Sequence, residues 1–207
     1  MNLSPFRCFT HVGLRSRIWV ISALIVLYSA LPFVLKYSRS LQSTIIYVNF
    51  IPLPLGDLSK PEYFGLEGTR HMCLKQYDKA DVCLWHILPT QYKDAREARY
   101  SDVFGDGASV IVYAHGNTGS RAVYHRVQLY QQLSALGYHV VAFDYRGFGD
   151  SGGSPSEVGL LEDLELVWNW LLPQVGDTQV FVYGHSLGTA PASKLAAQLS
   201  KSSELLS

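Results

Sequence analysis

The sequence predicts an α/β protein with a doubly wound, mostly parallel sheet behind one amino-terminal transmembrane helix. Three observations support this prediction: an uncharged apolar stretch near the amino terminus, apolar β-branched runs that alternate with helix-forming segments from residue 109 onward, and a glycine-flanked serine between the last such run and the last helix. Runs of this kind are typical of strands buried on both faces of a parallel sheet. Their alternation with helices indicates right-handed crossovers. With 48% hydrophobic and 16% charged residues, the 207-residue chain can bury one substantial core.

The first element is the apolar stretch 18–35, which carries no charge and is just long enough to cross a bilayer. Basic residues flank it, and Trp19 and Tyr37 stand near its ends, where interfacial rings are favoured. A cleaved signal peptide is the alternative, but the stretch is long for its apolar region, and Tyr28 stands where a small residue is preferred. We therefore expect a short cytosolic tail over 1–17, an uncleaved signal anchor over 18–35 and a juxtamembrane segment over 36–56.

Charge is distributed unevenly along the chain. Residues 1–56 hold five basic residues and no acidic one, whereas residues 57–207 hold 12 basic and 17 acidic residues, a balance of −5. A domain of that charge is a poor partner for nucleic acid. More basic residues precede the apolar stretch than closely follow it, which favours a cytosolic amino terminus and a domain outside the cell or in a lumen.

The cysteines and histidines give little sign of a redox or metal site. Cys73 and Cys83 can pair in an oxidising lumen, but with so few cysteines we favour two free thiols on neighbouring strands. Cys8 precedes the apolar stretch. The histidines lack the paired spacing of metal ligands, so we expect neither a metal nor a cofactor.

The domain elements then follow from Asp57 to the end of the chain. Residues 70–76 and 81–88 are expected to form an antiparallel hairpin around a turn at 77–79. Three further strands are predicted at 109–114, 138–143 and 179–183, and three helices at 121–136, 157–172 and 189–199. Gly137 closes the first of these helices. Ser154 and Glu157 predict a capping box at the second, whose apolar face comprises Leu160, Leu164, Val167, Trp168 and Leu171.

Ser186 is the candidate nucleophile. It lies in Gly184-His185-Ser186-Leu187-Gly188, directly after an apolar strand and directly before a helix. Gly184 and Gly188 permit the tight, strained turn that exposes a serine hydroxyl above a sheet, and the helix adds its positive end. An ordinary glycine-rich turn with an incidental serine is the alternative, which the strand–turn–helix context makes much the weaker one.

The segment 115–120, His-Gly-Asn-Thr-Gly-Ser, follows the strand 109–114 and precedes a helix. In an elbow-type enzyme this turn supplies one backbone N–H to the oxyanion hole. We assign the two donors to the N–H groups of Asn117 and Leu187, with Gly116 as a loop glycine. His115 is expected to be a structural hydrogen bonder rather than a base, and His185 to point away from the serine.

The segment 147–152 satisfies the G-x-G-x-x-G pattern of dinucleotide sites. We exclude that function, because residues 146–156, with Pro155 among them, separate the strand from its helix. A phosphate then could not sit on the helix start, as this binding mode requires. A packing turn beside the active site is expected instead.

These motifs occur in order behind a single anchor, and together they resemble the membrane-anchored α/β-hydrolases that act as monoacylglycerol and lysophosphatidylserine lipases. The likeness extends over most of the chain and is carried by segments 28–33, 48–50, 85–86, 115–119, 144–151 and 184–189. It implies a partial α/β-hydrolase fold over 57–207, a lipid ester as substrate, and a single-pass protein of the endoplasmic reticulum with a lumenal active site.

The resemblance also identifies a departure. Such hydrolases take their acid and histidine from positions after the serine, and Leu187 to Ser207 contains neither Asp nor His. We therefore expect the chain as written to be inactive, and the strand 179–183 to present a bare edge that could pair with a partner. Two alternatives stay open: a catalytically dead, membrane-tethered partner of a complete hydrolase, and a thioesterase or peptidase on the same scaffold.

Overall fold

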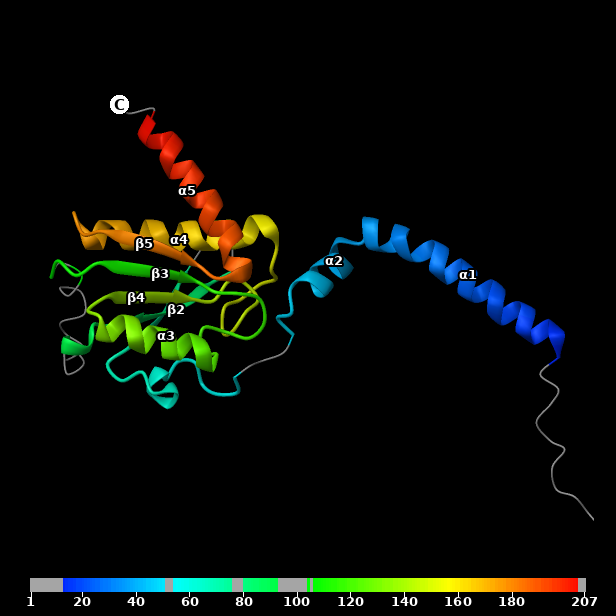
Figure 1. Cartoon of the computed structure of the whole chain (residues 1–207), viewed down its shortest axis with the longest axis horizontal. Coiled ribbons are helices and arrows are strands. Elements are labelled where there is room, and N and C mark those ends of the chain that lie inside the picture. Colours follow the sequence, from blue (N-terminus) through cyan, green and yellow to red (C-terminus); the bar gives the residue numbers. More distant parts are fainter. Residues whose placement is uncertain (1–12, 51–53, 76–79, 93–103, 105, 205–207) are drawn as a thin grey trace, which may run out of the picture. The chain divides into compact units, whose positions relative to one another are not determined.

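The computed structural model describes residues 13–50, 54–75, 80–92, 104 and 106–204. They divide into two compact units, residues 1–46 and 47–207, which are described separately (Figure 1). The predicted turn at 77–79 lies outside the described residues.

The first unit contains two helices, α1 (Leu14–Tyr37) and α2 (Arg39–Ile46). The stretch Ser16–Tyr37 of α1 has a mean hydropathy of 2.3 and buries none of its residues within the protein, so its length and composition suffice to cross a membrane. The Gln42 side chain donates to the carbonyls of Leu35 and Lys36 at 2.6 and 3.0 Å, which satisfies acceptors at the end of α1.

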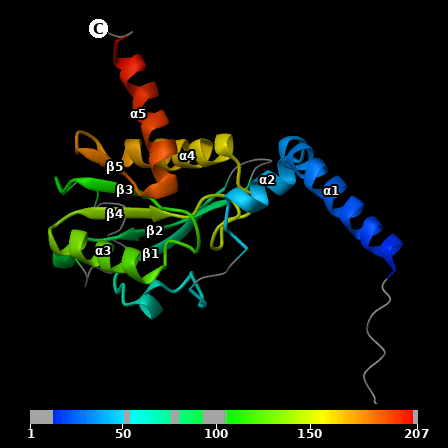
Figure 2. The same cartoon turned by 45° about the vertical axis from the view of Figure 1, so that its right-hand side comes forward.

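The second unit is built on a five-stranded sheet in the order β1-β2-β4-β3-β5 (Figure 2). β1 (Arg70–Leu74) and β2 (Val82–Ile87) pair antiparallel, as the sequence predicts, and β2 also pairs antiparallel with β4 (His139–Phe143). β3 (Val110–Ala114) lies parallel to both β4 and β5 (Val180–Gly184). The sheet is therefore mixed, with the parallel strands carrying the crossover helices.

Helices cover both faces of this sheet (Figure 1). α3 (Tyr124–Ala135) packs Val127 and Tyr130 against one face, in a core with Trp85, Tyr113 and Val140. On the other face, α4 (Glu157–Val175) and α5 (Thr189–Glu204) join a second core. The predicted apolar face of α4 is confirmed at four positions, which are buried: Leu160, Leu164, Val167 and Leu171.

Two helix starts differ from the sequence prediction. α3 begins at Tyr124 rather than Arg121, because Val123, with ψ +133°, lies outside the helical region. In the turn before it, the Arg121 backbone N–H donates to Asp144 Oδ1 at 2.6 Å. α4 is capped by Ser156, whose Oγ accepts the Gly159 N–H at 3.0 Å, and not by the predicted Ser154. A cap must immediately precede the first helical residue, which is Glu157.

The expectation of two free thiols is also wrong. Cys73 on β1 and Cys83 on β2 form a disulfide, because the hairpin register places these residues directly opposite one another. Cys83 is buried, and its backbone N–H donates to Ser151 Oγ at 2.9 Å. The disulfide thus fastens the hairpin beside the turn that follows β4.

β5 lies at one end of the strand order and pairs only with β3 among the described strands. Phe181 and Tyr183, at alternate positions, are 49% and 46% exposed. Among the described residues, β5 therefore leaves one strand edge without a strand partner, and Phe181 and Tyr183 leave part of one sheet face exposed beside it; pairing through this edge stays a prediction.

Candidate active site

The candidate nucleophile lies on a strand–turn–helix unit at the carboxyl end of β5. A short 3-10 turn, Ser186–Gly188, joins β5 to α5. Ser186 has φ +51°, a left-handed conformation that costs a residue with a Cβ about 1–2 kcal/mol. Its side chain is exposed. This is the geometry of a strained serine elbow, while the catalytic role of Ser186 stays a prediction.

The glycines of the elbow are required by close backbone contacts. A Cβ at Gly184 would come within 2.8 Å of Thr189 Cα. A Cβ at Gly188 would overlap the carbonyl group of Ala114 at the end of β3. Glycine at these two positions lets the turn pack directly on the sheet.

The loop 115–120 lies against this elbow. A Cβ at Gly116 would stand 3.1 Å from Ser186 Cβ and from the His185 ring, so a side chain here would crowd the elbow. Thr118 and Gly119 have φ +70° and +68°. The juxtaposition of loop and elbow fits the predicted oxyanion hole, whose donors remain the predicted N–H groups of Asn117 and Leu187.

A segment distant in sequence fixes the Asn117 side chain. Its Oδ1 accepts the backbone N–H of Val48 at 3.0 Å and that of Thr118 at 3.0 Å. Asn49 Nδ2 donates to the Gly147 carbonyl at 2.8 Å. The first residues of the second unit therefore hold two turns at the carboxyl ends of β3 and β4.

His115 is not placed to act as the base for Ser186. Its ring is fully buried, with Nε2 3.2 Å from Asp144 Oδ1 and Nδ1 2.7 Å from the Gly116 carbonyl. The ring packs against Tyr145 and Phe148. The structure thus gives His115 the structural role that the sequence indicates.

Asp144 and Arg121 form a buried ion pair beneath this loop, 2.5 Å apart and both fully buried. Burial by itself raises the pKa of Asp144, but the Arg121 guanidinium and His115 outweigh it and hold that pKa below its ordinary value. Arg121 also binds Asp150 at 2.6 and 3.0 Å. Asp144 and Asp150 therefore fix Arg121, the residue that directly follows the loop 115–120, through ion pairs.

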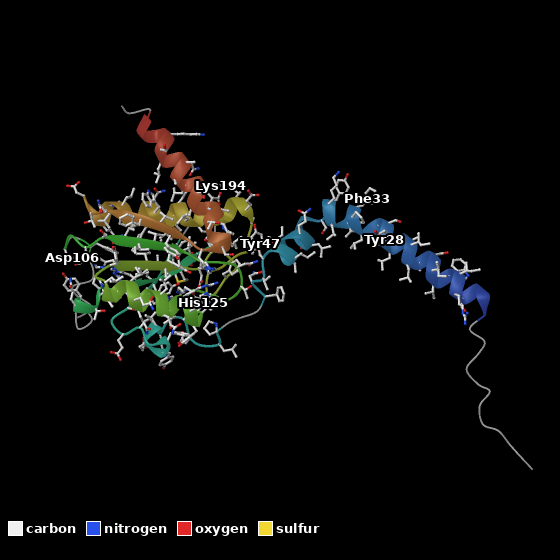
Figure 3. The ribbon with its side chains drawn as sticks, viewed as in Figure 1. Tyr28, Phe33, Tyr47, Asp106, His125 and Lys194 are labelled. Atoms are coloured by element: carbon white, nitrogen blue, oxygen red, sulfur yellow. A yellow bond between two sulfur atoms is a disulfide. The ribbon has the colours of Figure 1, made fainter. Side chains whose placement is uncertain are left out.

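His185 lies beside Ser186 in sequence but faces other rings. It stacks with Tyr113 at 6.5 Å between centroids and meets His125 edge-on at 6.0 Å. His125 lies on α3 (Figure 3), and its pKa is lowered by partial burial and by the neighbouring Arg126. Neither contact brings a carboxylate partner to these histidines.

The segment 147–152 has the packing role predicted for it. Gly147 and Gly149 have φ +77° and +54°. Ser151 Oγ donates to the Asp144 carbonyl at 2.7 Å, and Asp150 binds Arg121. α4 begins only at Glu157, so the segment 147–152 does not lead directly into a helix. Its polar groups instead bind the end of β4 and Arg121.

One group of candidate metal ligands escaped the sequence analysis, since its members come from two strands and a turn. Ligand atoms of His71, Cys73, Cys83 and Asp150 all lie within 4.8 Å of one another. In this state, however, the two sulfurs are bonded to each other. Arg121 binds Asp150 and lies 3.1 Å from His71 Nδ1, so its guanidinium supplies the positive charge that a metal ion would bring to these two residues.

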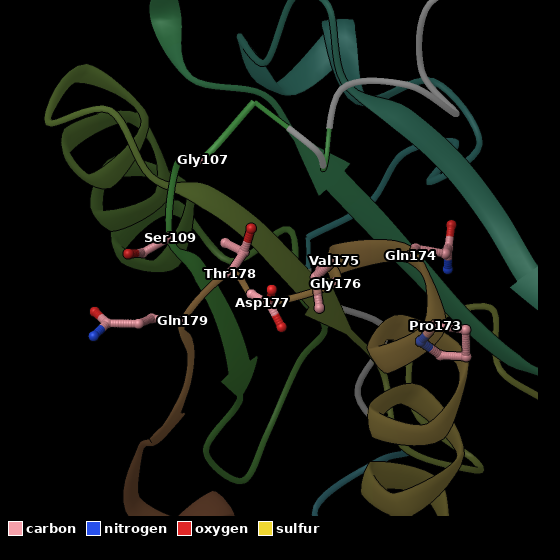
Figure 4. A pocket seen from close by; sticks show the side chains of 9 residues that line it. All are labelled: Gly107, Ser109, Pro173, Gln174, Val175, Gly176, Asp177, Thr178 and Gln179. Carbon is pink, nitrogen blue, oxygen red and sulfur yellow. The ribbon is translucent and has the colours of Figure 1, made fainter.

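A surface pocket of about 670 Å³ lies at the opposite end of the strands (Figure 4). It is lined by Gly107, Ser109 and residues 173–179, next to the first residues of β3 and β5. The elbow follows the last residue of β5, so this pocket is separate from the candidate nucleophile.

A mixed sheet with helices on both faces and a serine elbow after an interior-type strand defines the α/β-hydrolase class. A sequence profile of the alpha/beta hydrolase fold matches residues 109–204. Two solved structures share the fold at TM-scores of 0.50 and 0.51: a Pyrococcus furiosus esterase, Pf2001 (23% identity, 68% of this chain and 48% of that one), and an α/β serine hydrolase without lid from Xanthomonas campestris (22%, 64% and 57%).

Curated relatives are closer in sequence. Lysophosphatidylserine lipase ABHD12 of Mus musculus is 39% identical over 198 residues, and that of Gallus gallus 40%; each alignment covers 91% of this chain, and 50% and 52% of the respective relative. Protein ABHD12B of Homo sapiens is 40% identical over 160 residues, 75% of this chain and 44% of that protein. The chain belongs to the α/β-hydrolase family, and it spans about half the length of these relatives.

Proposed function

We propose that this chain carries the nucleophile of a membrane-bound serine hydrolase that cleaves the acyl ester of a lysophospholipid, such as lysophosphatidylserine, or of a monoacylglycerol. The observation that carries this proposal is Ser186 at φ +51° on a strand–turn–helix unit, facing the glycine loop at Gly116. The similarity to lysophosphatidylserine lipases supports the substrate class. The apolar helix α1 supports a membrane location, where amphiphilic esters concentrate.

The reaction would begin with attack of Ser186 Oγ on the ester carbonyl. The carbonyl oxygen would gain negative charge and accept the N–H groups of Asn117 and Leu187; loss of one such donor typically costs about 3 kcal/mol in the transition state. The serine proton needs an acceptor. Within the described residues, His115 is engaged with Asp144 and His185 with aromatic rings, so we infer that the base comes from outside them and that residues 1–207 alone are inactive.

Hydrolysis by the native protein in lipid vesicles tests this function. Fatty-acid release is measured from lysophosphatidylserine, monoacylglycerol and an acyl thioester, and release of new amino groups from a peptide, with Ser186→Ala as the matched control. Release from the two lipid esters that disappears in the Ser186→Ala variant is expected. Equal release by both proteins contradicts the proposal, and preference for the thioester or peptide selects the alternative substrate class.

We further propose that the domain lies in the lumen of the endoplasmic reticulum. The Cys73–Cys83 disulfide supports this location, because disulfides persist in oxidising compartments. Protease treatment of sealed microsomes tests it. Protection of the domain, lost on detergent addition, is expected, whereas digestion in sealed vesicles places the domain in the cytosol.

A second candidate function, as a membrane-tethered partner of a complete hydrolase, is favoured by the exposed edge of β5. Phe181 and Tyr183 offer it a partly apolar surface, and an unpaired strand edge accepts another strand. Cross-linking in native membranes tests it: a mixed complex supports partnership, and a monomer opposes it.

A further inference from the structure

Arg126 is a buried cation near the candidate site, and within the described residues its side-chain hydrogen bonds go to backbone carbonyls. It lies on α3, only 2% of it is exposed, and its guanidinium donates to four carbonyls of the loop beside the elbow. Nη1 binds the Ser120 carbonyl at 2.6 Å, and Nη2 lies 2.9, 3.3 and 3.0 Å from the carbonyls of Gly116, Asn117 and Thr118.

The charge of Arg126 has no carboxylate within ion-pair distance among the residues that the structure describes. By contrast, Arg121 and Arg146 each bind carboxylates. A buried guanidinium is costly unless it is compensated, and here backbone carbonyl dipoles alone compensate it. The carbonyls that compensate the charge of Arg126 all belong to the loop that is predicted to supply an oxyanion donor.

We propose that Arg126 is a positioning residue that presets the oxyanion hole, an inference that rests on the proposed function. A peptide unit is planar, and its C=O and N–H point in opposite directions. By drawing the carbonyls of residues 116–118 toward one guanidinium, Arg126 turns the intervening N–H groups the other way. The Asn117 N–H belongs to the peptide whose carbonyl, that of Gly116, Arg126 holds at 2.9 Å.

This role explains the backbone of the loop. Thr118 occupies a left-handed conformation at φ +70° although it carries a Cβ. Such a conformation costs about 1–2 kcal/mol and persists only where surrounding contacts determine it. Arg126 provides such a contact directly, through the Thr118 carbonyl.

The arginine also serves better than a lysine. A guanidinium presents five N–H donors in a rigid planar fork, whereas an ammonium presents three donors around one point. Two nitrogens of Arg126 share carbonyls from both ends of the loop, Gly116 and Ser120. A lysine at this position keeps the charge and cannot span both ends.

Two measurements on Arg126→Lys test the proposal. The first is amide hydrogen exchange of segment 115–123 in the full chain, anchor included, in detergent micelles. We expect exchange to accelerate at least about tenfold in this segment, with little change in β3 and β4. The second is hydrolysis by the native protein: we expect kcat to fall about 10- to 100-fold with KM within about twofold, because a misplaced donor weakens the transition state more than substrate binding.

Arg146→Lys is the matched control, because Arg146 is also largely buried but binds Glu162 and Asp163 on α4. It should leave exchange of segment 115–123 unchanged. The proposal is overturned if Arg126→Lys leaves that exchange unchanged, or if the loop loosens while kcat keeps its parental value.

The first measurement needs no activity, so the two proposals fail separately. Ser186-independent hydrolysis by the parent sinks the proposed function, and exchange then decides alone whether Arg126 orders the loop. If Arg126→Lys loses protection across the whole sheet, Arg126→Ala is measured with added methylguanidinium or methylammonium. Restoration by the guanidinium alone supports the proposal, and equal effects of the two cations contradict it.

Discussion

The left-handed backbone of Ser186 predicts that replacing this candidate nucleophile by glycine stabilises the fold, whereas most substitutions destabilise a protein. A left-handed residue with a Cβ costs about 1–2 kcal/mol, which glycine does not incur. Glycine in turn loses about 0.5–1 kcal/mol more backbone entropy on folding. The difference predicts that Ser186→Gly raises the free energy of unfolding by about 0.5–1 kcal/mol, while abolishing any reaction at Ser186.

Two controls separate strain from other effects. Ser186→Ala keeps the Cβ and the strain, so the unfolding free energy should stay within about 0.5 kcal/mol of the parent, as for most exposed positions. Ser193→Gly lies in α5, where its serine Oγ binds the Thr189 carbonyl at 2.8 Å. Glycine is less favourable than serine inside a helix by about 0.5 kcal/mol, so this variant should lower stability, the opposite sign.

Urea unfolding followed by tryptophan fluorescence gives the comparison, provided that the slope of free energy against urea is the same in all four proteins. Trp85, Trp168 and Trp170 report on the domain. The strain argument is refuted if Ser186→Gly destabilises the domain as Ser193→Gly does.

Three further predictions concern groups around the sheet. Asp144→Asn should lower the unfolding free energy by about 3 kcal/mol in urea titrations, the lower end for breaking a buried ion pair, since the Arg121 guanidinium loses its fully buried carboxylate and keeps only the more exposed Asp150; a loss below about 1 kcal/mol would contradict this. Replacing Cys73 and Cys83 by serine should cost about 3 kcal/mol for a loop of this length, and maleimide should label Cys73 and Cys83 of the parent only after reduction. Burial and the neighbouring His139 hold the pKa of His86 well below its ordinary value. The unfolded chain then binds the extra proton, so stability is complete above about pH 6.5 and falls on acidification, by about 1.4 kcal/mol from His86 between pH 7.5 and 5.5; His86→Gln should remove that part of the slope.

The sequence predicts those parts of the fold that depend on local patterns. The strands at 110–114 and 180–184 are continuous apolar runs, and the elbow at Ser186 is defined by its neighbours within the turn. Errors arise where a neighbouring residue competes for the same role. Ser154 and Ser156 are both able caps, and only the position of the first helical residue decides between them.

Interactions between distant segments were beyond prediction from the sequence. The Val48–Asn117 hydrogen bond joins residues 69 positions apart, and no local pattern reports it. The Cys73–Cys83 disulfide depends on the hairpin register, which a turn of different length would change. Arg126 is one of several polar residues in the helix predicted at 121–136, and only the folded loop reveals its four carbonyl partners.

The costly features of this domain gather at the carboxyl ends of the parallel strands. Left-handed residues with a Cβ occur at Thr118 and Ser186, and Arg121, Asp144 and Arg126 are all buried nearby. Each lowers stability unless its neighbours compensate it, and the compensating groups are shared: Asp144 serves both Arg121 and His115. Substitutions here should therefore be non-additive, since removing one partner changes the cost of keeping the others. Such a concentration of strain and buried charge is expected where a fold must hold a loop and a turn in fixed relation before any substrate arrives.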